Sequence, residues 1–359
     1  MASTPIFWRD EMTKIDLRSL YPEELKTIFN EQGFEAYRAG QVLNWLQKGV
    51  RSFDEMTNLS KALREKLDSL FFISNMSEAE SLVSKIDGTT KYLFTLPDGE
   101  HVESVLLSYQ HGYSVCLSTQ VGCKMGCKFC ASTKAGYCRD LTAGEILLQM
   151  VEITRDKRKT DPDFRIGHVV LMGIGEPLDN YDNVIRFLHL CNSKELFGIG
   201  YRNISLSTCG LIPKIYDLME EELPITLSIS LHASNDALRS ELMPVNRKYP
   251  MAELIRACKD YTNKTGRRIS FEYAVIQGVN DTPERSKELI GLLGGWLNHL
   301  NLIPINPTKE TDYRPATKKT MQDFISRLEK GGINATVRRT LGADIQAACG
   351  QLRREKQQH

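Results

Sequence analysis

Several features that would indicate a membrane or secreted protein are missing from this sequence. It has no apolar run long enough to cross a bilayer, and its N-terminal segment has no hydrophobic core like that of a signal peptide. Net charge is nearly absent as well, because 46 Lys and Arg residues face 45 Asp and Glu residues. We therefore expect a cytoplasmic protein in which any contact with nucleic acid depends on local groups of basic residues.

The cysteine count argues against a simple disulfide framework. Nine cysteines are an odd number, and no export signal accompanies them. In a reducing compartment, such cysteines serve metal binding or thiol chemistry more often than disulfide bonds. The remaining composition, with 41% hydrophobic and 25% charged residues, is typical of a globular protein. A chain of 359 residues is long enough for one large domain and a smaller one.

One short segment concentrates the cysteines. Residues 120–133 read QVGCKMGCKFCAST and place Cys123, Cys127 and Cys130 in C-x3-C-x2-C spacing. Two glycines within the segment let the backbone turn tightly around these side chains. Three thiolates from one loop can hold an iron–sulfur cluster by three corners and leave the fourth iron open for a reaction. A structural zinc site with Cys138 as fourth ligand is the alternative that the spacing leaves open.

The rest of the chain predicts an α/β fold in four parts. Residues 1–78 show the periodicity of short helices, and residues 79–112 alternate like the strands of a small β extension around Asp-Gly turns. Between residues 113 and 310, strands alternate with helices, which indicates a parallel sheet. Residues 311–359 contain a helix, a strand and a final loop. Because no Rossmann glycine fingerprint is present, we predict a partial (β/α) barrel with an N-terminal helical domain.

Polar and glycine-rich residues stand where the expected barrel strands end. We expect these strands at 114–118, 168–172, 203–207, 225–230, 269–275, 301–305 and 335–339, and helices at 143–154, 183–191, 251–261, 283–293 and 319–330. Catalytic residues of such a barrel lie at the carboxyl ends of its strands. The residues found there are Gly175, Glu176, Ser207, Ser230, Leu231, His232 and Asn306. Each alone is typical of a turn or a satisfied strand end, but together they predict one binding site.

Two further cysteines and one acid complete the candidates. Cys116 lies in the strand before the three-cysteine segment, and Cys349 lies in an Ala-Ala-Cys-Gly-Gln loop near the C-terminus. By spacing alone, buried packing explains the Cys349 loop better than catalysis does, because a free cysteine behaves as a small hydrophobic residue. Glu103, within Val-Glu-Ser, is an ordinary strand carboxylate when considered alone. We expect structural roles for the others: Cys138, Cys191, Cys209 and Cys258.

Taken together, these motifs resemble the RlmN/Cfr family of radical S-adenosylmethionine (SAM) RNA methyltransferases. The resemblance extends from about Leu17 to Leu352. Its motifs are the three-cysteine segment, MGIGEP at 172–177, SLH at 230–232, MPVN at 243–246, AACGQ at 347–351 and the N-terminal SFDEMTNLS at 52–60. It implies a [4Fe-4S] cluster on Cys123, Cys127 and Cys130. It also implies that SAM is held by the strand-end residues Gly175, Glu176, Ser207, Ser230, Leu231, His232 and Asn306.

The resemblance implies a radical route for methylating adenine. C2 of adenine is electron-poor and does not attack the methyl group of SAM. In the family, Cys349 would first take a methyl group from one SAM. A second SAM, reduced at the cluster, would give the 5′-deoxyadenosyl radical that removes hydrogen from this methyl group. After addition to the ring, Glu103 would accept the proton and Cys116 would attack the sulfur of Cys349, so two SAM molecules and a Cys116–Cys349 disulfide belong to each turnover.

The implied substrates are 23S rRNA and tRNA, methylated at C2 of adenine 2503 and adenine 37 respectively. The implied electron donor is of the flavodoxin and reductase type, and no membrane partner is expected. Pro177 is typical of the RlmN branch, whereas the Cfr branch, which methylates C8, tends to carry Ala there. Alternatives are a C8 methyltransferase, a radical SAM enzyme for small molecules, and a non-catalytic zinc-stabilised RNA-binding protein.

Candidate phosphate contacts are basic residues beside the cysteine segment and on the helical domain. They are Lys124, Lys128, Lys134, Arg139, Lys48, Arg51 and Arg64. From composition alone, the helical domain could equally be a solvated cap.

Overall fold

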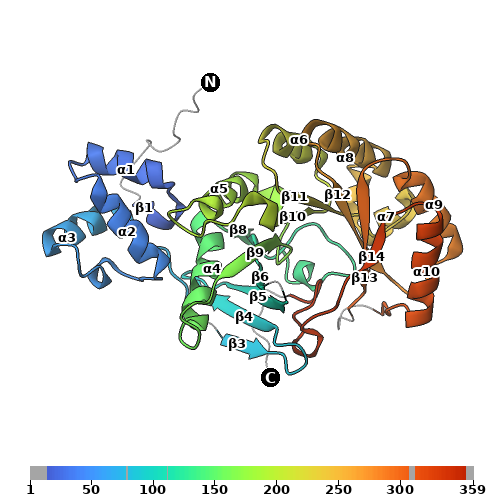
Figure 1. Ribbon diagram of the computed structural model, residues 1–359, viewed down its shortest axis with the longest axis horizontal. Helices are drawn as coiled ribbons and strands as arrows, with labels where there is room; N and C mark the ends of the chain where they lie inside the picture. Colours follow the sequence, from blue (N-terminus) through green and yellow to red (C-terminus); the bar gives the residue numbers. More distant parts are fainter. Residues whose placement is uncertain (1–13, 78–79, 111, 307–311, 353–359) are drawn as a thin grey trace.

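The computed structural model describes residues 14–77, 80–110, 112–306 and 312–352. Ten strands form one sheet in the order β14-β13-β12-β11-β10-β9-β6-β5-β4-β3 (Figure 1). These strands are β3 (Glu80–Val83), β4 (Thr90–Thr95), β5 (His101–Tyr109), β6 (Gly112–Cys116), β9 (Ile166–Leu171), β10 (Ile204–Thr208), β11 (Thr226–Ser230), β12 (Ile269–Val275), β13 (Asn298–Pro304) and β14 (Ala335–Val337).

The seven strands from β6 to β14 pair in parallel and form the barrel part of the sheet. Helices connect successive strands and lie outside the sheet in Figure 1. They are α4 (Ala143–Lys157), α5 (Tyr181–Asn192), α6 (Ile212–Glu220), α7 (Asp236–Leu242), α8 (Met251–Thr265), α9 (Pro283–Leu293) and α10 (Lys318–Lys330). Among the described strands, β14 and β3 form the two open edges of the sheet, so the predicted partial barrel of an α/β protein is confirmed.

The β extension is continuous with the barrel. Strands β3, β4 and β5 are antiparallel to one another, and β5 pairs antiparallel with β6, the first barrel strand. In this register Val105 lies opposite Cys116. The antiparallel strands therefore place their side chains directly beside the start of the cysteine segment.

All seven expected barrel strands are present, although their ends differ from the expected ones. Strand β6 ends at Cys116. Leu117 still bonds to Val170 and Gly173, and the amide of Ser118 then turns away and donates to Oε1 of Gln149 at 3.0 Å. Strand β13 begins three residues earlier than expected, at Asn298. Helices α6 and α7 were not among the expected elements. The expected divisions at 78/79 and 310/311 fall on residues outside the described ranges.

The N-terminal part has its own small core. Helices α1 (Pro22–Glu31), α2 (Tyr37–Gln47) and α3 (Lys61–Leu70) pack around Leu25, Phe29 and Leu67, which are fully buried. The short strands β1 (Ile15–Asp16) and β2 (Phe71–Phe72) pair in parallel and join the ends of this region. The short helices expected from the periodicity of residues 1–78 are thus present as α1, α2 and α3.

Polar contacts dock this helical domain against the barrel. Nη1 of Arg186, in α5 of the barrel, donates to Oε2 of Glu24, in α1, at 2.7 Å. The amide of Gly144, in α4, donates to Oγ of Ser19 at 3.0 Å. Among the described helices, none is long and apolar enough to cross a membrane.

Candidate active site

A cavity of about 160 Å³ lies at the carboxyl ends of the parallel strands. Three parts of the chain line it: the cysteine segment, the strand ends and the C-terminal loop. The predicted site residues that meet there are Cys123, Cys127, Cys130, Gly175, Glu176, Ser207, Ser230, His232, Asn306 and Cys349. Leu231 is instead packed in the main core, and Glu103 lies outside the cavity lining.

The cysteine segment is a closed loop held by a pair of very short strands. Strand β7 (Gln120–Val121) pairs antiparallel with β8 (Arg139–Asp140) at the base of the loop. Gly122 has φ +77°, and a Cβ built on it would lie 1.7 Å from the carbonyl oxygen of Gly136. Only glycine fits this left-handed, close approach of two backbones. The glycine therefore closes the loop and directs its cysteines into the cavity.

The chemistry of the three thiols fits an iron–sulfur cluster. Burial raises the pKa of Cys127 well above its usual value, and the neighbouring Cys130 and Cys123 raise it further. Burial also raises the pKa of Cys123 to about 12. Three thiolates so close together in a buried cavity require cations among them, and soft sulfur ligands are those that iron–sulfur clusters use. The three cysteines can thus hold such a cluster when it is present.

The zinc alternative finds no support in the position of Cys138. This side chain is exposed, and its Sγ contacts Oε1 of Glu100 at 3.6 Å, away from the residues that line the cavity. Within the described ranges, no group of three or more His, Cys, Asp or Glu side chains forms a ready site for a single metal ion.

Glu176 connects three elements around the cavity. Its Oε2 accepts from the amide of Cys209, after β10, at 2.7 Å, and its Oε1 accepts from the amide of Leu178 at 3.0 Å. Its own amide donates to Oε1 of Gln120 at 2.8 Å, while Nε2 of Gln120 donates to Asp140 at 2.8 Å. Burial raises the pKa of Glu176, and the hydrogen bonds oppose this rise. The Gly-Glu turn is therefore tied to both ends of the cysteine loop.

His232 is held in a strained conformation beside the loop. Its φ is 55°, and the amide of Ala274 donates to its Nδ1 at 2.9 Å, which leaves the ring proton on Nε2. Burial lowers the pKa of His232 to about 3, with a smaller contribution from Arg239, so the ring is neutral. Its ring meets that of Phe129 edge-on at 4.8 Å between centroids. Such strained residues cluster at functional sites, where the surrounding packing maintains them.

The Cys349 loop, residues 342–352, returns from β14 across the open side of the barrel (dark red in Figure 1). At its start, the amide of Gly342 donates to Oδ2 of Asp87, in the turn between β3 and β4, at 2.9 Å. Nδ2 of Asn306 donates to the carbonyl of Cys349 at 3.0 Å. The amide of Ala131, which follows Cys130, donates to the carbonyl of Gly350 at 2.8 Å. The loop is therefore anchored to both arms of the sheet and to the cysteine segment.

A second cavity of about 40 Å³ contains the other cysteine pair. Cys116 and Cys349 both line it, together with Tyr109, Met172 and Arg338. Burial raises the pKa of Cys116 to about 12; Cys349 raises it further, and Arg338 opposes the rise. Because Cys349 lines both cavities, it can face the cysteine segment on one side and Cys116 on the other.

Three charged residues at the site were not predicted from the sequence. Arg338 lines both cavities just after β14, and Glu272 of β12 lines the larger one. Arg239 is fully buried and donates to the carbonyls of Cys209 and Ser230 at 2.7 and 3.0 Å. Arg338 stands at a strand end like the predicted residues, so the same reasoning could have found it. No comparable sequence signal marks Glu272 or Arg239.

Glu103 lies in a buried layer next to Cys116. It is two residues from Val105, which pairs with Cys116, so the side chains of Glu103 and Cys116 are on the same face of the sheet. Its Oε1 forms an ion pair with Nζ of Lys91 at 3.1 Å. The expected acid is therefore near the cysteine pair, but its carboxylate is already engaged.

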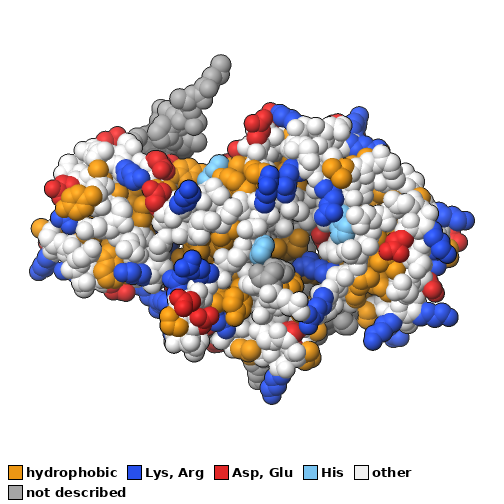
Figure 2. Space-filling model, in the orientation of Figure 1, with side chains coloured by type: hydrophobic (Ala, Val, Ile, Leu, Met, Phe, Trp, Pro, Cys, Tyr) orange, Lys and Arg blue, Asp and Glu red, His pale blue; other side chains and the backbone are white. Residues whose placement is uncertain are grey.

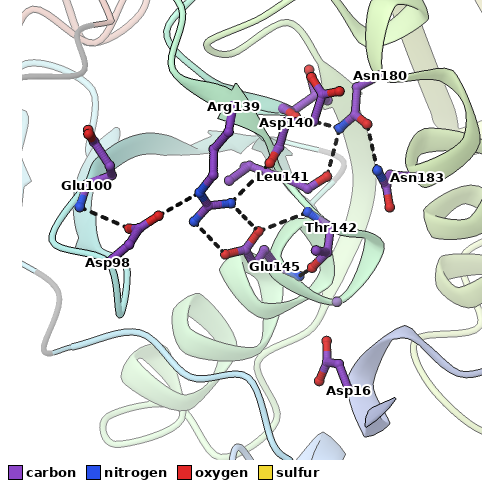
Figure 3. A network of polar contacts seen from close by, with 12 residues as sticks. Asp16, Asp98, Glu100, Arg139, Asp140, Leu141, Thr142, Glu145, Asn180 and Asn183 are labelled. Atoms are coloured by element: carbon purple, nitrogen blue, oxygen red, sulfur yellow. Dashed lines mark hydrogen bonds and ion pairs between the residues drawn. The ribbon is translucent and has the colours of Figure 1, made fainter. Parts of the chain in front are cut away.

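The candidate phosphate contacts differ in availability. Figure 3 shows Arg139 between Asp98, at 2.6 Å, and Glu145, at 2.8 and 2.9 Å. The other candidates that form ion pairs are Lys124 with Asp179, Lys128 with Glu241, Arg51 with Glu152 and Arg64 with Asp54. Lys134 and Lys48 are exposed. In Figure 2, Lys and Arg side chains lie on both the helical domain and the barrel, with Asp and Glu between them.

A three-cysteine loop at the mouth of a partial parallel barrel defines a radical SAM enzyme. Comparison with known families agrees, since the Radical SAM superfamily model matches residues 117–290 and the ribosomal RNA large subunit methyltransferase N-terminal domain matches residues 15–73. Two relatives are each named "Probable dual-specificity RNA methyltransferase RlmN". The relative from Desulforamulus reducens is 49% identical over 96% of this chain and 98% of its own length. The relative from Clostridium beijerinckii is 51% identical over 92% of this chain and 93% of its own length.

A solved structure supports the same grouping. The crystal structure of a radical SAM methyltransferase from Sphaerobacter thermophilus superposes with a TM-score of 0.89 at 41% identity, covering 95% of this chain and 100% of that one. The chain belongs to the RlmN family of radical SAM RNA methyltransferases.

Proposed function

We propose that this enzyme methylates C2 of adenosine in 23S rRNA and tRNA through a methylated Cys349. The observation that supports this most strongly is the position of Cys349, which lines the cavity of the cysteine segment and also the cavity of Cys116. A methyl carrier must face SAM in one step and a resolving thiol in another, and this side chain borders both places. The names of the relatives, which call them dual-specificity RNA methyltransferases, are the basis for proposing both RNA substrates.

Cys123, Cys127 and Cys130 would hold the [4Fe-4S] cluster, and SAM would bind beside it. When bound, the cluster supplies the electron that cleaves SAM reductively, and a donor of the flavodoxin type would deliver that electron to the protein. The Gly175-Glu176 turn would hold the SAM amine, with hydroxyl groups of Ser207 and Ser230 nearby. Their Oγ atoms are 3.5 Å apart on neighbouring strands.

His232 and Asn306 would orient rather than react. The Nδ1 of His232 is occupied by the Ala274 amide, so its Nε2–H remains as a fixed donor. Asn306 holds the carbonyl of Cys349, which limits where this sulfur can move. Leu231 lies in the core, and its backbone carbonyl accepts from Nε of Arg239 at 3.3 Å. We therefore propose that Leu231 supports the site through its backbone.

The cysteine pair and Glu103 would complete the reaction. Cys349 accepts a methyl group from one SAM, and a second SAM is consumed when that methyl group is activated. Glu103 then takes the proton from adenine. Cys116, once deprotonated, attacks the sulfur of Cys349. The bond from this sulfur to the methylene carbon breaks, its electron pair stays on that carbon, which takes up a proton, and methylated RNA leaves with a Cys116–Cys349 disulfide. All nine cysteines of the chain are free in the structure, which agrees with a place in the reducing cytoplasm.

Mass spectrometry of RNA nucleosides tests this proposal directly. Purified enzyme is incubated anaerobically with SAM, a reductant and 23S rRNA or tRNA transcripts, and C2- and C8-methyladenosine are separated. We expect 2-methyladenosine in both RNAs. Formation of 8-methyladenosine would support the C8 alternative, and methylation of neither RNA would refute the proposal.

A further inference from the structure

We infer that Lys91 is a positioning residue that keeps Glu103 ionised beneath Cys116, so that this carboxylate can accept the proton from adenine. The inference rests on the proposed function, because it takes Glu103 as the proton acceptor. The ion pair between the two residues lies in the antiparallel part of the sheet, outside the motifs of the cysteine segment and the strand ends.

The pair is fully enclosed by the sheet and what covers it. Nζ of Lys91 and Oε1 of Glu103 are 3.1 Å apart, and the two side chains are only 4% and 2% exposed. Lys91 lies opposite Val105, and Val105 lies opposite Cys116. Lys91, Glu103 and Cys116 therefore belong to three neighbouring strands and share one face of the sheet.

Glu103 is also fixed through its backbone. Oγ of Ser118 donates to the carbonyl of Glu103 at 2.6 Å, and the amide of Ile174 donates to the same Oγ at 2.9 Å. Ile174 belongs to the Gly-Ile-Gly-Glu turn that lines the larger cavity. The residue that holds the carboxylate is thus connected, through one hydroxyl group, to the proposed SAM site.

Stability alone gives no reason for such a pair. Two buried opposite charges stabilise a fold no better than well-packed apolar residues of the same size. A carboxyl group buried without a partner would instead take up a proton, because burial disfavours the charged form. A protonated carboxyl group cannot act as a base. Lys91 supplies the opposite charge that keeps the carboxylate ionised where water does not reach it.

The step itself is a proton transfer. Once the carbon attached to Sγ of Cys349 has bonded to C2, the ring adduct has to give up one electron, which the cluster would accept when bound, and the C2–H bond then breaks. Its electron pair stays in the ring and restores aromaticity, and the proton passes to the Glu103 carboxylate. Attack of Cys116 on the sulfur of Cys349 follows only after this step.

The test uses RNA with deuterium at C2 of the target adenine. We compare Lys91→Met, Lys91→Arg and Glu103→Gln, with Lys85→Met as matched control because Lys85 is exposed in the turn before β4. The readouts are 5′-deoxyadenosine, methylation of Cys349, the covalent RNA–protein adduct, and deuterium within that adduct. Cys116→Ala serves as the reference for an adduct that has already lost its deuterium.

We expect Lys91→Met to behave like Glu103→Gln. Formation of methylated RNA should fall by roughly 10²-fold or more, the usual contribution of a general base. The adduct should accumulate with its deuterium retained, while Cys349 methylation and SAM cleavage continue. Lys91→Arg, which keeps the charge, should recover part of the rate, and Lys85→Met should match the wild type.

Other outcomes overturn the inference. If Lys91→Met forms product at the wild-type rate, or its adduct has lost deuterium, Lys91 does not act through Glu103, while the proposed function stands. If Lys91→Met does not fold, it is replaced by the double variant Lys91→Met/Glu103→Gln, in which both members of the ion pair are uncharged. That double variant must be no slower than Glu103→Gln alone, and a further loss refutes the role. A wild-type enzyme that makes no 2-methyladenosine refutes both proposals.

Discussion

Replacing Gly122 by Ala should prevent the cysteine segment from holding its cluster. Gly122 directly precedes Cys123 and has φ +77°. An added Cβ would lie 1.7 Å from the carbonyl oxygen of Gly136, whereas real Cβ atoms essentially never come closer than 3.0 Å to such an atom. The two backbones must therefore separate by at least 1.3 Å, the difference between 3.0 and 1.7 Å.

The size of this effect can be isolated with a matched variant. Gly136 faces Gly122 and has a similar φ of +71°, yet a Cβ there would meet no described atom within 4 Å. Both alanine variants carry the cost of a left-handed residue, about 1–2 kcal/mol. Only Gly122→Ala also displaces the base of the loop, and metal–ligand distances tolerate shifts of only about 0.2 Å.

Iron and sulfide analysis after anaerobic reconstitution measures the outcome. We expect Gly136→Ala to bind iron like the wild type, with a slightly lower melting temperature. Gly122→Ala should lose most of its iron and the associated visible absorbance. Equal iron in the two variants would show that the loop adjusts without moving its cysteines, and the reasoning from backbone contact would be refuted.

Three other outcomes follow from the site. Cys127→Ala should abolish reductive SAM cleavage while circular dichroism stays that of the wild type; 5′-deoxyadenosine from this variant would exclude Cys127 as a cluster ligand. Because burial raises the pKa of Cys116 to about 12, decay of the RNA–protein adduct, followed on denaturing gels, should accelerate about tenfold per pH unit between pH 7 and 9. A decay independent of pH would mean that Cys116 deprotonation does not limit resolution. Lys134→Gln should reduce the slope of log affinity for tRNA against log salt by roughly 0.7–0.9. Arg139→Gln should leave this slope unchanged in the same anisotropy titration, since two carboxylates already engage Arg139, and equal slopes for the two variants would refute this distinction.

Periodicity and strand ends were sufficient to predict the barrel and most of the cavity lining. Parallel strands bring their carboxyl ends to one edge, so Glu176, Ser207 and His232 could be grouped without knowing any contact. Leu231 shows the limit of that reasoning, because adjacent residues at a strand end point in different directions. Its neighbour His232 lines the cavity, whereas Leu231 is packed in the core.

Contacts between distant segments could not be predicted in this way. The pairing of Lys91 with Glu103 depends on the register of two antiparallel strands. A shift of one residue in this register would place the two side chains on opposite faces of the sheet. The bond from Asn306 to the carbonyl of Cys349 depends on where a loop 43 residues later returns. The ion pairs of Arg139 depend on two carboxylates, Asp98 from the β4–β5 turn and Glu145 from α4. Such positions are set by the assembled fold.

Because the sheet is open, the distance between the thiols of Cys116 and Cys349 depends on how strongly the sheet is twisted. Cys116 is on β6, whereas the Cys349 loop follows β14, and six strand interfaces separate the two. Neighbouring strands are rotated by roughly 20–25°, so about 120–150° of accumulated twist lies between the two cysteine-bearing segments. A change of a few degrees at each interface therefore adds up across the sheet and alters the gap between the two thiols. The hydrogen bonds from the Cys349 loop to Asp87 and Ala131 bridge the open side of the sheet, so they hold the two thiols together against such changes.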